Sequence, residues 1–592
     1  MKADRKLLAA PLALILASTA AAGEKEELLK LKNTTLNLID ILVQQGIIDK
    51  SKAEDMIKQA ETKAAAEAKA EAAKEEQVAA KQGNPGKGKP GPVRVTYVPD
   101  FVKDEIRAEV SKELRDEVVK EVKSQAKTEK WGVPAALPDW VNRFKLSGDI
   151  RLRGEGDFYA DDNPDNESPE HFTPFYSNWL AINRGADPET EREAYFNTSE
   201  DRNRYRMRLR LGLTAEITKN LIAGVRIATS NDRSPVSINQ TLGQTGRQYE
   251  LALDRAYLEY DFEDAKGRDW FTLWGGRFNN PWFSTDNLYD SDLGFEGFAG
   301  TFRIPIGDKP AVTDNYYRLG PQFRQINFGH TVADSVYLTL GAFPLQEIEL
   351  SSKDKWMVGA QLGFDMLFGS DSRLKFGTAI YEFNNVAARP NQLIPGSNDN
   401  RENDHTAPEF MQKGNSIMQI SNDDGELFPR LVGIASDFRV LDFTAAYDYS
   451  GFDPVHVMLT GDFSENLGYD EQEILERAAP VGGRAGLLAY DNTNPKTTAF
   501  QVRLDVGYPE ITKFGNWSAF LAYKYLERDA VLDAFTDSNF RLGGTNAKGW
   551  VFGANYGLAK NTWLNVRWMS ADEIDGPPFG VDVLLVDLNA RY

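Results

Sequence analysis

The stretch RYRMRLRLGLTAEI, residues 204–217, decides the fold of this chain. Apolar residues occupy every second position from Tyr205 to Ile217, and the positions between them include Arg204, Arg206, Arg208 and Arg210. A period of two residues predicts a β-strand with one apolar and one polar face. The apolar face continues for about the 9 to 11 residues that a tilted strand needs to cross a bilayer. We therefore predict a membrane-spanning strand.

The same period recurs to the C-terminus. We predict strands at 142–153, 204–217, 221–230, 251–262, 269–278, 295–304, 334–343, 356–368, 372–383, 429–449, 455–464, 498–508, 514–527, 548–558, 562–571 and 581–592. Connections after odd strands are long and those after even strands are mostly tight, as in a barrel with outer loops and inner turns. The count is about 16, an even number, as single-chain bacterial barrels require.

One connection departs from this scheme. Residues 305–333 should form an inner turn, yet they are long and contain the strand-like FRQINF at 323–328. An additional strand pair there would raise the total to 18. The predicted fold class is thus an all-β transmembrane antiparallel barrel of about 16 strands, or 18, preceded by an α-helical and coiled-coil segment.

The N-terminus predicts export. Lys2, Arg5 and Lys6 precede an apolar stretch from Leu7 to Ala17, and the run 20–22 matches a cleavage signal, so residues 1–22 form a predicted signal peptide. An uncleaved anchor helix is the alternative, but the apolar run is short for a span of about 20 residues. Beyond it no apolar run of 18 or more residues occurs, so membrane embedding must use strands.

Helical patterns separate the signal peptide from the strands. Residues 23–82 predict a helical hairpin and spacer, 83–99 a Gly/Pro linker, and 100–140 a helical segment, before a barrel at 141–592. In the last helix an apolar seam steps by four residues through Val102, Ile106, Val110, Leu114, Val118 and Val122. Such a narrow seam favours a coiled coil or packing against a partner.

Composition excludes several classes of function. The net charge of the 592 residues is −20, which argues against nucleic-acid binding because such proteins need a basic surface. Cysteine is absent and the four histidines are not closely paired, so we expect no metal and no cofactor. His456, in the run PVHVML, is the only histidine of a predicted strand that we consider as a catalytic candidate. A lone histidine is more often structural, so we expect no enzyme.

The chain ends in an aromatic residue after an alternating strand. Tyr592 follows Leu584, Val586 and Leu588, which resembles the C-terminal strand that the bacterial barrel-assembly machinery recognises. We therefore expect the outer membrane as the location, with its lipid and lipopolysaccharide as partners and the helical region in the periplasm.

Several runs together resemble the Putative porin family of Gram-negative bacteria. They are LLKLKNTTLNLIDILVQQG (28–46), VPDFVKDEIRAEV (98–110), SGDIRLRGEGDF (147–158), SEDRNRYRMRLRLGL (199–213), ATSNDRSPVSINQTLG (228–243), GGRFNNPWFSTD (275–286) and GAFPLQEIELSSKDKW (341–356). The resemblance implies a porin-like barrel with periplasmic helices, and residues 305–333 stand out from it as an insertion. By analogy with many porins of this strand number, it also implies a homotrimer.

The resemblance implies a feature of general porins: their third outer loop folds inward and places acidic groups opposite a basic wall. That loop is here 279–294, which contains Asp286, Asp290 and Asp292, with Glu296 just after it. The opposing wall would consist of Arg151, Arg153, Arg204, Arg206, Arg208 and Arg210, together with Arg226. These charges could line a constriction or form ordinary salt bridges in the barrel wall.

The leading functional hypothesis is passive diffusion of small hydrophilic solutes and ions through a charged, water-filled lumen. An anion-selective channel is an alternative, since arginine suits oxyanions, although the acidic loop favours a broad or mildly cation-preferring pore equally. A second alternative is a structural tether whose periplasmic helices contact peptidoglycan. An outer-membrane enzyme would need a cluster of histidine, serine and acidic residues that the sequence does not offer.

Overall fold

The computed structural model describes residues 141–592, except 166–173, 231–233, 307–324, 331, 350–351, 394–399, 423–429 and 489–494. The predicted signal peptide, helical hairpin, linker and coiled-coil segment lie outside the described residues. No helix in the described part of the chain is both long and apolar enough to cross a membrane.

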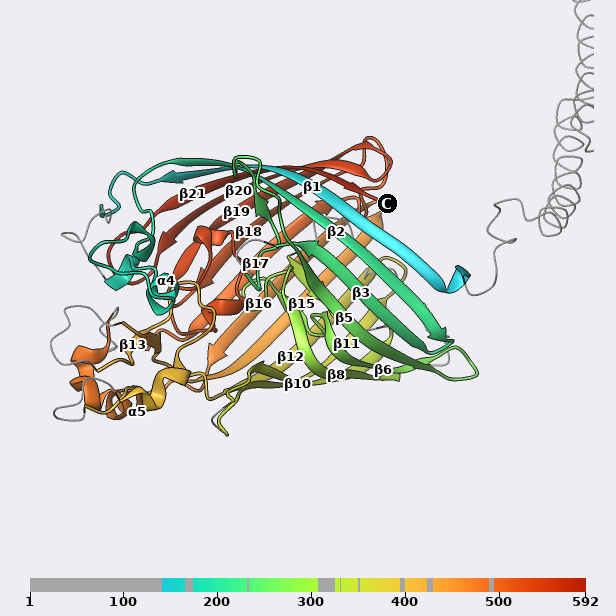
Figure 1. Cartoon of the computed structure of the whole chain (residues 1–592). Coiled ribbons are helices and arrows are strands. Elements are labelled where there is room, and N and C mark those ends of the chain that lie inside the picture. Colours follow the sequence, from blue (N-terminus) through green and yellow to red (C-terminus); the bar gives the residue numbers. More distant parts are fainter. Residues whose placement is uncertain are drawn as a thin grey trace, which may run out of the picture. The chain divides into compact units, whose positions relative to one another are not determined.

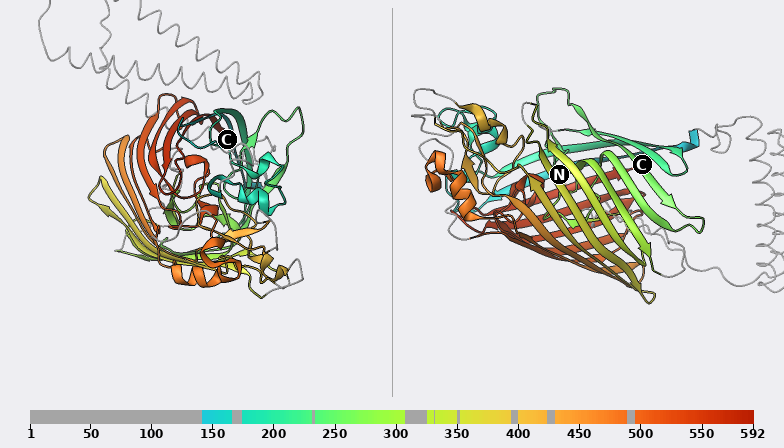
Figure 2. Two further views of the ribbon diagram at one scale, coloured as in Figure 1. Left: turned by 90° about the vertical axis from the view of Figure 1, so that its left-hand side faces the viewer. Right: turned by 90° about the horizontal axis from the view of Figure 1, so that it is seen from below.

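The described residues form a closed antiparallel barrel (Figures 1 and 2). Its strands are β1 (Phe144–Tyr159), β2 (Arg202–Thr218), β3 (Leu221–Thr229), β5 (Leu251–Glu263), β6 (Asp269–Asn279), β8 (Gly294–Pro305), β10 (Ser335–Gln346), β11 (Lys355–Phe368), β12 (Ser372–Asn384), β15 (Phe438–Phe452), β16 (Val455–Asn466), β17 (Thr498–Gly507), β18 (Trp517–Leu526), β19 (Ala547–Ala559), β20 (Thr562–Glu573) and β21 (Val581–Arg591). Each pairs with the next, and β21 pairs with β1. The 17-stranded sheet consists of these sixteen and the short β4 (Gln240–Thr241), so the prediction of sixteen barrel strands is confirmed.

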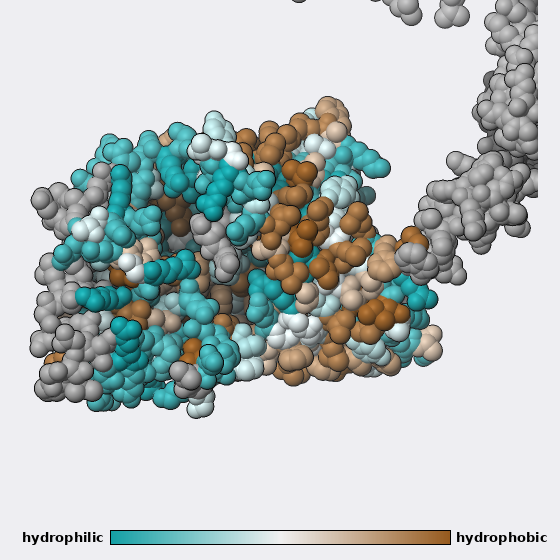
Figure 3. Space-filling view, viewed as in Figure 1, coloured by the Kyte–Doolittle hydropathy of each residue, from teal (hydrophilic) through white to brown (hydrophobic). Residues whose placement is uncertain are grey.

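The barrel is apolar outside and polar inside. On β8, Phe298 and Ile304 are 73% and 65% exposed, whereas the intervening Arg303 is buried. This reverses the arrangement of a water-soluble protein and matches strands that have lipid on one side and a polar lumen on the other. Figure 3 shows a hydrophobic band over the strands and a hydrophilic surface at one end.

The connection 305–333 adds no strand pair to the barrel. β8 pairs directly with β10, with Arg303 opposite Tyr337, so no described strand lies between them. The strand-like residues form β9 (Ile326–Phe328), which pairs with β7 (Phe283–Thr285) of the third outer loop. The alternative of 18 strands is therefore wrong, because β9 pairs with β7 of the third outer loop and not with a strand of the wall.

Most long connections gather at one end of the barrel, near α4 (Trp179–Asn183) and α5 (Glu471–Arg477) in Figure 1. They also contain the hairpin of β13 (Ile417–Gln419) and β14 (Val432–Ile434). Short 3-10 helices occur at Val141–Arg143, Pro174–Tyr176, Arg192–Ala194, Arg401–Thr406, Ala479–Val481, Gly483–Gly486, Asp533–Phe535 and Phe540–Leu542. The largest apolar core lies where these connections meet the inner face of the wall.

Candidate functional site

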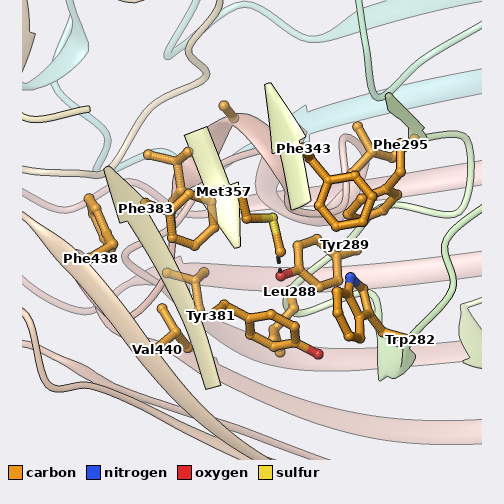
Figure 4. Close-up of a cluster of buried hydrophobic side chains, with 14 of the residues drawn as sticks. Trp282, Leu288, Tyr289, Phe295, Phe343, Met357, Tyr381, Phe383, Phe438 and Val440 are labelled. Atoms are coloured by element: carbon orange, nitrogen blue, oxygen red, sulfur yellow. Dashed lines mark hydrogen bonds between the residues drawn. The ribbon is translucent and has the colours of Figure 1, made fainter. Parts of the chain in front are cut away.

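Residues 280–293, here called the third loop, connect β6 to β8 and cross the inside of the barrel. Trp282 is fully buried and packs edge-on against Phe343 of β10 and Tyr381 of β12, with ring centroids 6.1 and 5.3 Å away (Figure 4). The Phe283 amide donates to Gln361 Oε1 at 2.8 Å, and Gln361 Nε2 donates back to the Phe283 carbonyl at 2.7 Å. These contacts fix the start of the loop on the inner face of the wall.

The inner connection braces the same loop. β9 pairs with β7, and the rings of Phe328 and Phe283 stack with centroids 5.8 Å apart. The Asp286 amide donates to the Gln325 carbonyl at 2.9 Å, and Arg503 Nη1 donates to Gln325 Oε1 at 3.0 Å. The third loop is thus held by both the barrel wall and the inner connection.

The acidic side chains of the loop point in different directions. Asp286 forms an ion pair with Lys524 of β18, at 2.8 Å, and so does not face the β2 arginines. Asp290 accepts the backbone amides of Asp292 and Ser538, at 2.8 and 2.9 Å. Burial, with the neighbouring charge of Asp292, raises the pKa of Asp290 well above its ordinary value.

Asp292 is the loop carboxylate that faces the arginines. It lies 3.4 Å from Arg208 Nη1 and 3.8 Å from Arg210 Nη1. Burial opposes its ionisation, but the positive charges of Arg208, Arg151 and Arg210 outweigh burial and lower the pKa of Asp292 to about 2. Asp292 is therefore negatively charged across the physiological pH range.

The arginines lie on the inner face of β1 and β2, where carboxylates alternate with them. Arg208 and Arg210 share Asp149 of β1, at 2.8 and 2.6 Å. Arg204 and Arg206 share Glu155, with Arg206 at 3.1 Å. Carboxylates between like charges offset the repulsion that a bare row of arginines would suffer.

The β1 arginines have separate partners. Arg153 binds Asp587 of β21 through two hydrogen bonds, at 2.7 and 2.8 Å. Arg151 donates to Asn239 and lies 3.9 Å from Asp587. Arg226 of β3 pairs with Asp254 of β5. Every arginine of the predicted wall thus has a polar partner, yet the wall still borders open space.

Glu296 lies apart from this wall. It pairs with Arg277 of β6, and its side chain is 57% exposed. On β8 it occupies the same alternate positions as the outward-facing Phe298 and Phe302. The structure therefore does not bring Glu296 together with the other predicted site residues, because strand alternation turns it away from the lumen.

Two polar cavities meet at the contact between Arg208 and Asp292. One, of about 50 Å³, is lined by Arg151, Arg153, Arg208, Asn239, Asp587 and others. The other, of about 540 Å³, is lined by Arg208, Arg210, Arg226, Arg255 and the inner residues 325–330. Both share Arg208, Asp290, Ser291, Asp292 and Gln325. A charged bridge between loop and wall thus separates two spaces inside the barrel.

Comparison with known proteins identifies the family. The family model described as Putative porin matches residues 32–592. The chain belongs to this family. As a member of this family, the porin is an outer-membrane channel protein.

The search of curated proteins found no match. Among solved structures, the porin is similar to OprB of Pseudomonas putida at high pH, with 11% identity, 77% of this chain and 96% of that chain covered, and a TM-score of 0.38. It is also similar to the outer membrane channel DcaP of Acinetobacter baumannii, with 10% identity, 76% and 97% coverage, and a TM-score of 0.35. A third is OmpF of Salmonella typhi in complex with daunomycin, with 12% identity, 76% and 97% coverage, and a TM-score of 0.35.

The last strand of the porin closes the barrel. The backbone of Tyr592 exchanges hydrogen bonds with Gly148 of β1, at 3.1 and 3.2 Å. On β21, Leu584, Val586 and Leu588 occupy the outward positions, and the Asp587 between them is buried. Recognition of this strand by the barrel-assembly machinery stays a prediction.

Other lumen residues of the porin were not predicted from the sequence. The outer connection between β18 and β19 folds inward, so Asn539 accepts from Arg153 at 3.0 Å and the Asp537 amide donates to the Asp286 carbonyl at 3.1 Å. Arg255 and Asp254 of β5 line or border the larger cavity. The loop residues carry no local sequence signal, because their contacts come from strands far away in the chain.

Proposed function

We propose that this porin allows passive diffusion of small hydrophilic solutes and ions through a charged, water-filled lumen. The observation that carries the proposal is the bridge from Asp292 to Arg208 and Arg210, which stands between two polar cavities inside a barrel with an apolar exterior. Solutes that keep their hydration meet polar groups along such a path, and the charges beside its narrowest part decide which ions pass readily.

The placement of the charges gives the lumen a transverse field. Arginines on β1 and β2 form one side, and the carboxylate of Asp292 projects toward them from the third loop. A dipolar solute lowers its energy by turning its negative end toward the arginines and its positive end toward the loop. Because Trp282 and Gln361 anchor the third loop, the space between Asp292 and the arginines keeps its geometry while solutes pass.

Conductance in a planar bilayer tests the proposal. The refolded wild-type protein should give stepwise current, and Arg206→Gln/Arg208→Gln should shift the reversal potential in a KCl gradient toward cation preference. Arg439→Gln is the matched control, because Arg439 lies on the outward side of β15, 51% exposed and paired with Glu382. A silent membrane from demonstrably folded protein would overturn the proposal.

The partners form a second part of the proposal. The outward apolar residues, such as Phe298 and Ile304, suit contact with lipid and with the acyl chains of lipopolysaccharide. The apolar seam predicted at 102–122 supports self-association, and the analogy with porins of this strand number supports a homotrimer. Chemical cross-linking of the full mature chain in membranes tests the trimer. Cross-linked dimers and trimers are expected, and monomer alone would contradict the trimer.

A further inference from the structure

A β-bulge in β5 places two consecutive residues on the same side of the wall. Arg226 of β3 lies opposite Arg255, but the next residue, Ile227, lies opposite Leu253, so Asp254 is an extra residue in β5. Asp254 and Arg255 are therefore both buried inside, 5% and 7% exposed, while Leu253 is 59% exposed on the outer side. Bulges of this kind re-aim side chains and occur often beside functional sites.

The bulge turns Arg255 toward the larger cavity without giving it a carboxylate of its own. The cavity's four arginines are Arg208, Arg210, Arg226 and Arg255. Among the described residues, the carboxylates in ion pairs with them are Asp149, Asp254 and Asp292. The cavity's other two acids are engaged elsewhere: Glu259 accepts from Trp274 Nε1 at 3.0 Å, and Asp290 accepts two backbone amides.

Of these four arginines, Arg255 has the weakest ion pairing. Its only ion pair among the described residues is with Asp254, at 3.9 Å from Nε, and Asp254 already pairs with Arg226. In the part of the chain that the structure describes, Arg255 Nε is buried without a hydrogen-bond partner, and so is Arg226 Nη2. A guanidinium removed from bulk water and left without an acceptor is costly, and an anion in the cavity would relieve that cost.

We propose that Arg226 and Arg255 form a binding subsite for a small oxyanion, a solute that carries a carboxylate or phosphate group. The subsite rests on the proposed function and names the class of solute that this lumen favours. The planar guanidinium fork matches the paired oxygens of these groups. A cavity of about 540 Å³ has room for a small organic acid.

The rest of the cavity favours an organic anion over a bare halide. Trp274 and His330 line the cavity, and their rings meet edge to face with centroids 5.3 Å apart. This aromatic surface can contact the carbon skeleton of a solute whose charged group binds the arginines. Arg208 and Arg210, which contact Asp292, line the same cavity as the subsite, so a solute at the subsite shares that cavity with the bridge.

Isothermal titration calorimetry on the folded full chain in detergent tests the subsite. The probes are inorganic phosphate and malonate, with glucose as the neutral comparison. Wild-type protein should bind both anions and not glucose. Arg255→Gln should weaken anion binding about tenfold or more, because charge-assisted hydrogen bonds are lost. Arg439→Gln should bind as wild type does.

Arg255→Lys and Arg226→Gln keep the test decisive if Arg255→Gln does not fold. The lysine variant should bind more weakly than wild type, since it keeps the charge and loses the fork. Arg226→Gln should weaken binding as Arg255→Gln does. Absence of phosphate and malonate binding to wild-type protein, or equal binding by wild type and by either folded glutamine variant, would overturn the subsite.

Conductance measured on the same preparations separates the two proposals. A wild-type protein that conducts KCl but binds neither anion refutes the subsite and leaves the diffusion channel standing. A protein that binds the anions through Arg255 but gives no current refutes the diffusion channel and leaves the binding site standing.

Discussion

Replacing Asp292 by asparagine removes one charge from the bridge with almost no change of shape. In the wild-type protein this carboxylate is ionised, because the neighbouring arginines lower its pKa to about 2. In Asp292→Asn, the carboxylate that Arg208 and Arg210 still share, among the described residues, is Asp149. The local charge beside the narrow contact therefore becomes more positive by one unit, and we expect a shift toward anion selectivity.

The size of the shift follows from Coulomb's law. A monovalent ion passing about 5 Å from the lost charge in water changes its energy by about 0.8 kcal/mol. That energy changes the local concentration of each ion roughly fourfold, upward for anions and downward for cations. Screening at about 0.1 M salt reduces both effects modestly over this distance. We therefore expect the anion-to-cation permeability ratio to rise about tenfold.

The reversal potential in a KCl gradient measures this ratio directly. Asp264→Asn is the matched control, because Asp264 lies in the tight turn after β5 and its carboxylate accepts from Lys266 and Arg268 of the same turn. The control should leave the reversal potential unchanged. An Asp292→Asn channel with the wild-type reversal potential, or with one shifted toward cations, would refute the assignment of Asp292 to the ion path.

Three further changes test other parts of the structure. Trp282→Ala should cost about 3–5 kcal/mol of packing at the fully buried loop anchor and give larger, noisier conductance steps, and single-channel recording that found wild-type steps would contradict the anchoring role. Burial raises the pKa of Asp533 to about 7, so the folded state loses stability as pH rises from about 4 to 7. Asp533→Asn should abolish this loss, which is measured as the difference between the free energies of unfolding at pH 5 and pH 8. An unchanged pH dependence in the variant would be evidence against the role of Asp533. Deleting residues 23–140 should leave conductance unchanged while causing envelope defects if those residues tether the layers, and a changed conductance would tie them to the pore instead.

The strand period gave most of the barrel in advance. Because alternate residues of a strand face opposite sides, the sequence around Arg204 to Arg210 already predicted a polar face of arginines and an apolar face for lipid. The alternation of β8 also implied that Glu296 would face outward with Phe298 and Phe302, although its position beside the acidic loop suggested the lumen. Local alternation was the more reliable guide, since it depends only on backbone geometry.

Tertiary structure alone decided the loop contacts and the bulge. Asp286 pairs with Lys524, and β9 pairs with β7, because loops take partners from strands that are distant in sequence. In the run LALDRAYLEY of β5, residues 251–260, strict alternation would turn either Asp254 or Arg255 inward, but not both. The bulge in the register with β3 turns both of them inward. Strand periodicity is local and can be read from the sequence, whereas a loop's partners and a bulge's position depend on neighbouring strands that the sequence does not specify.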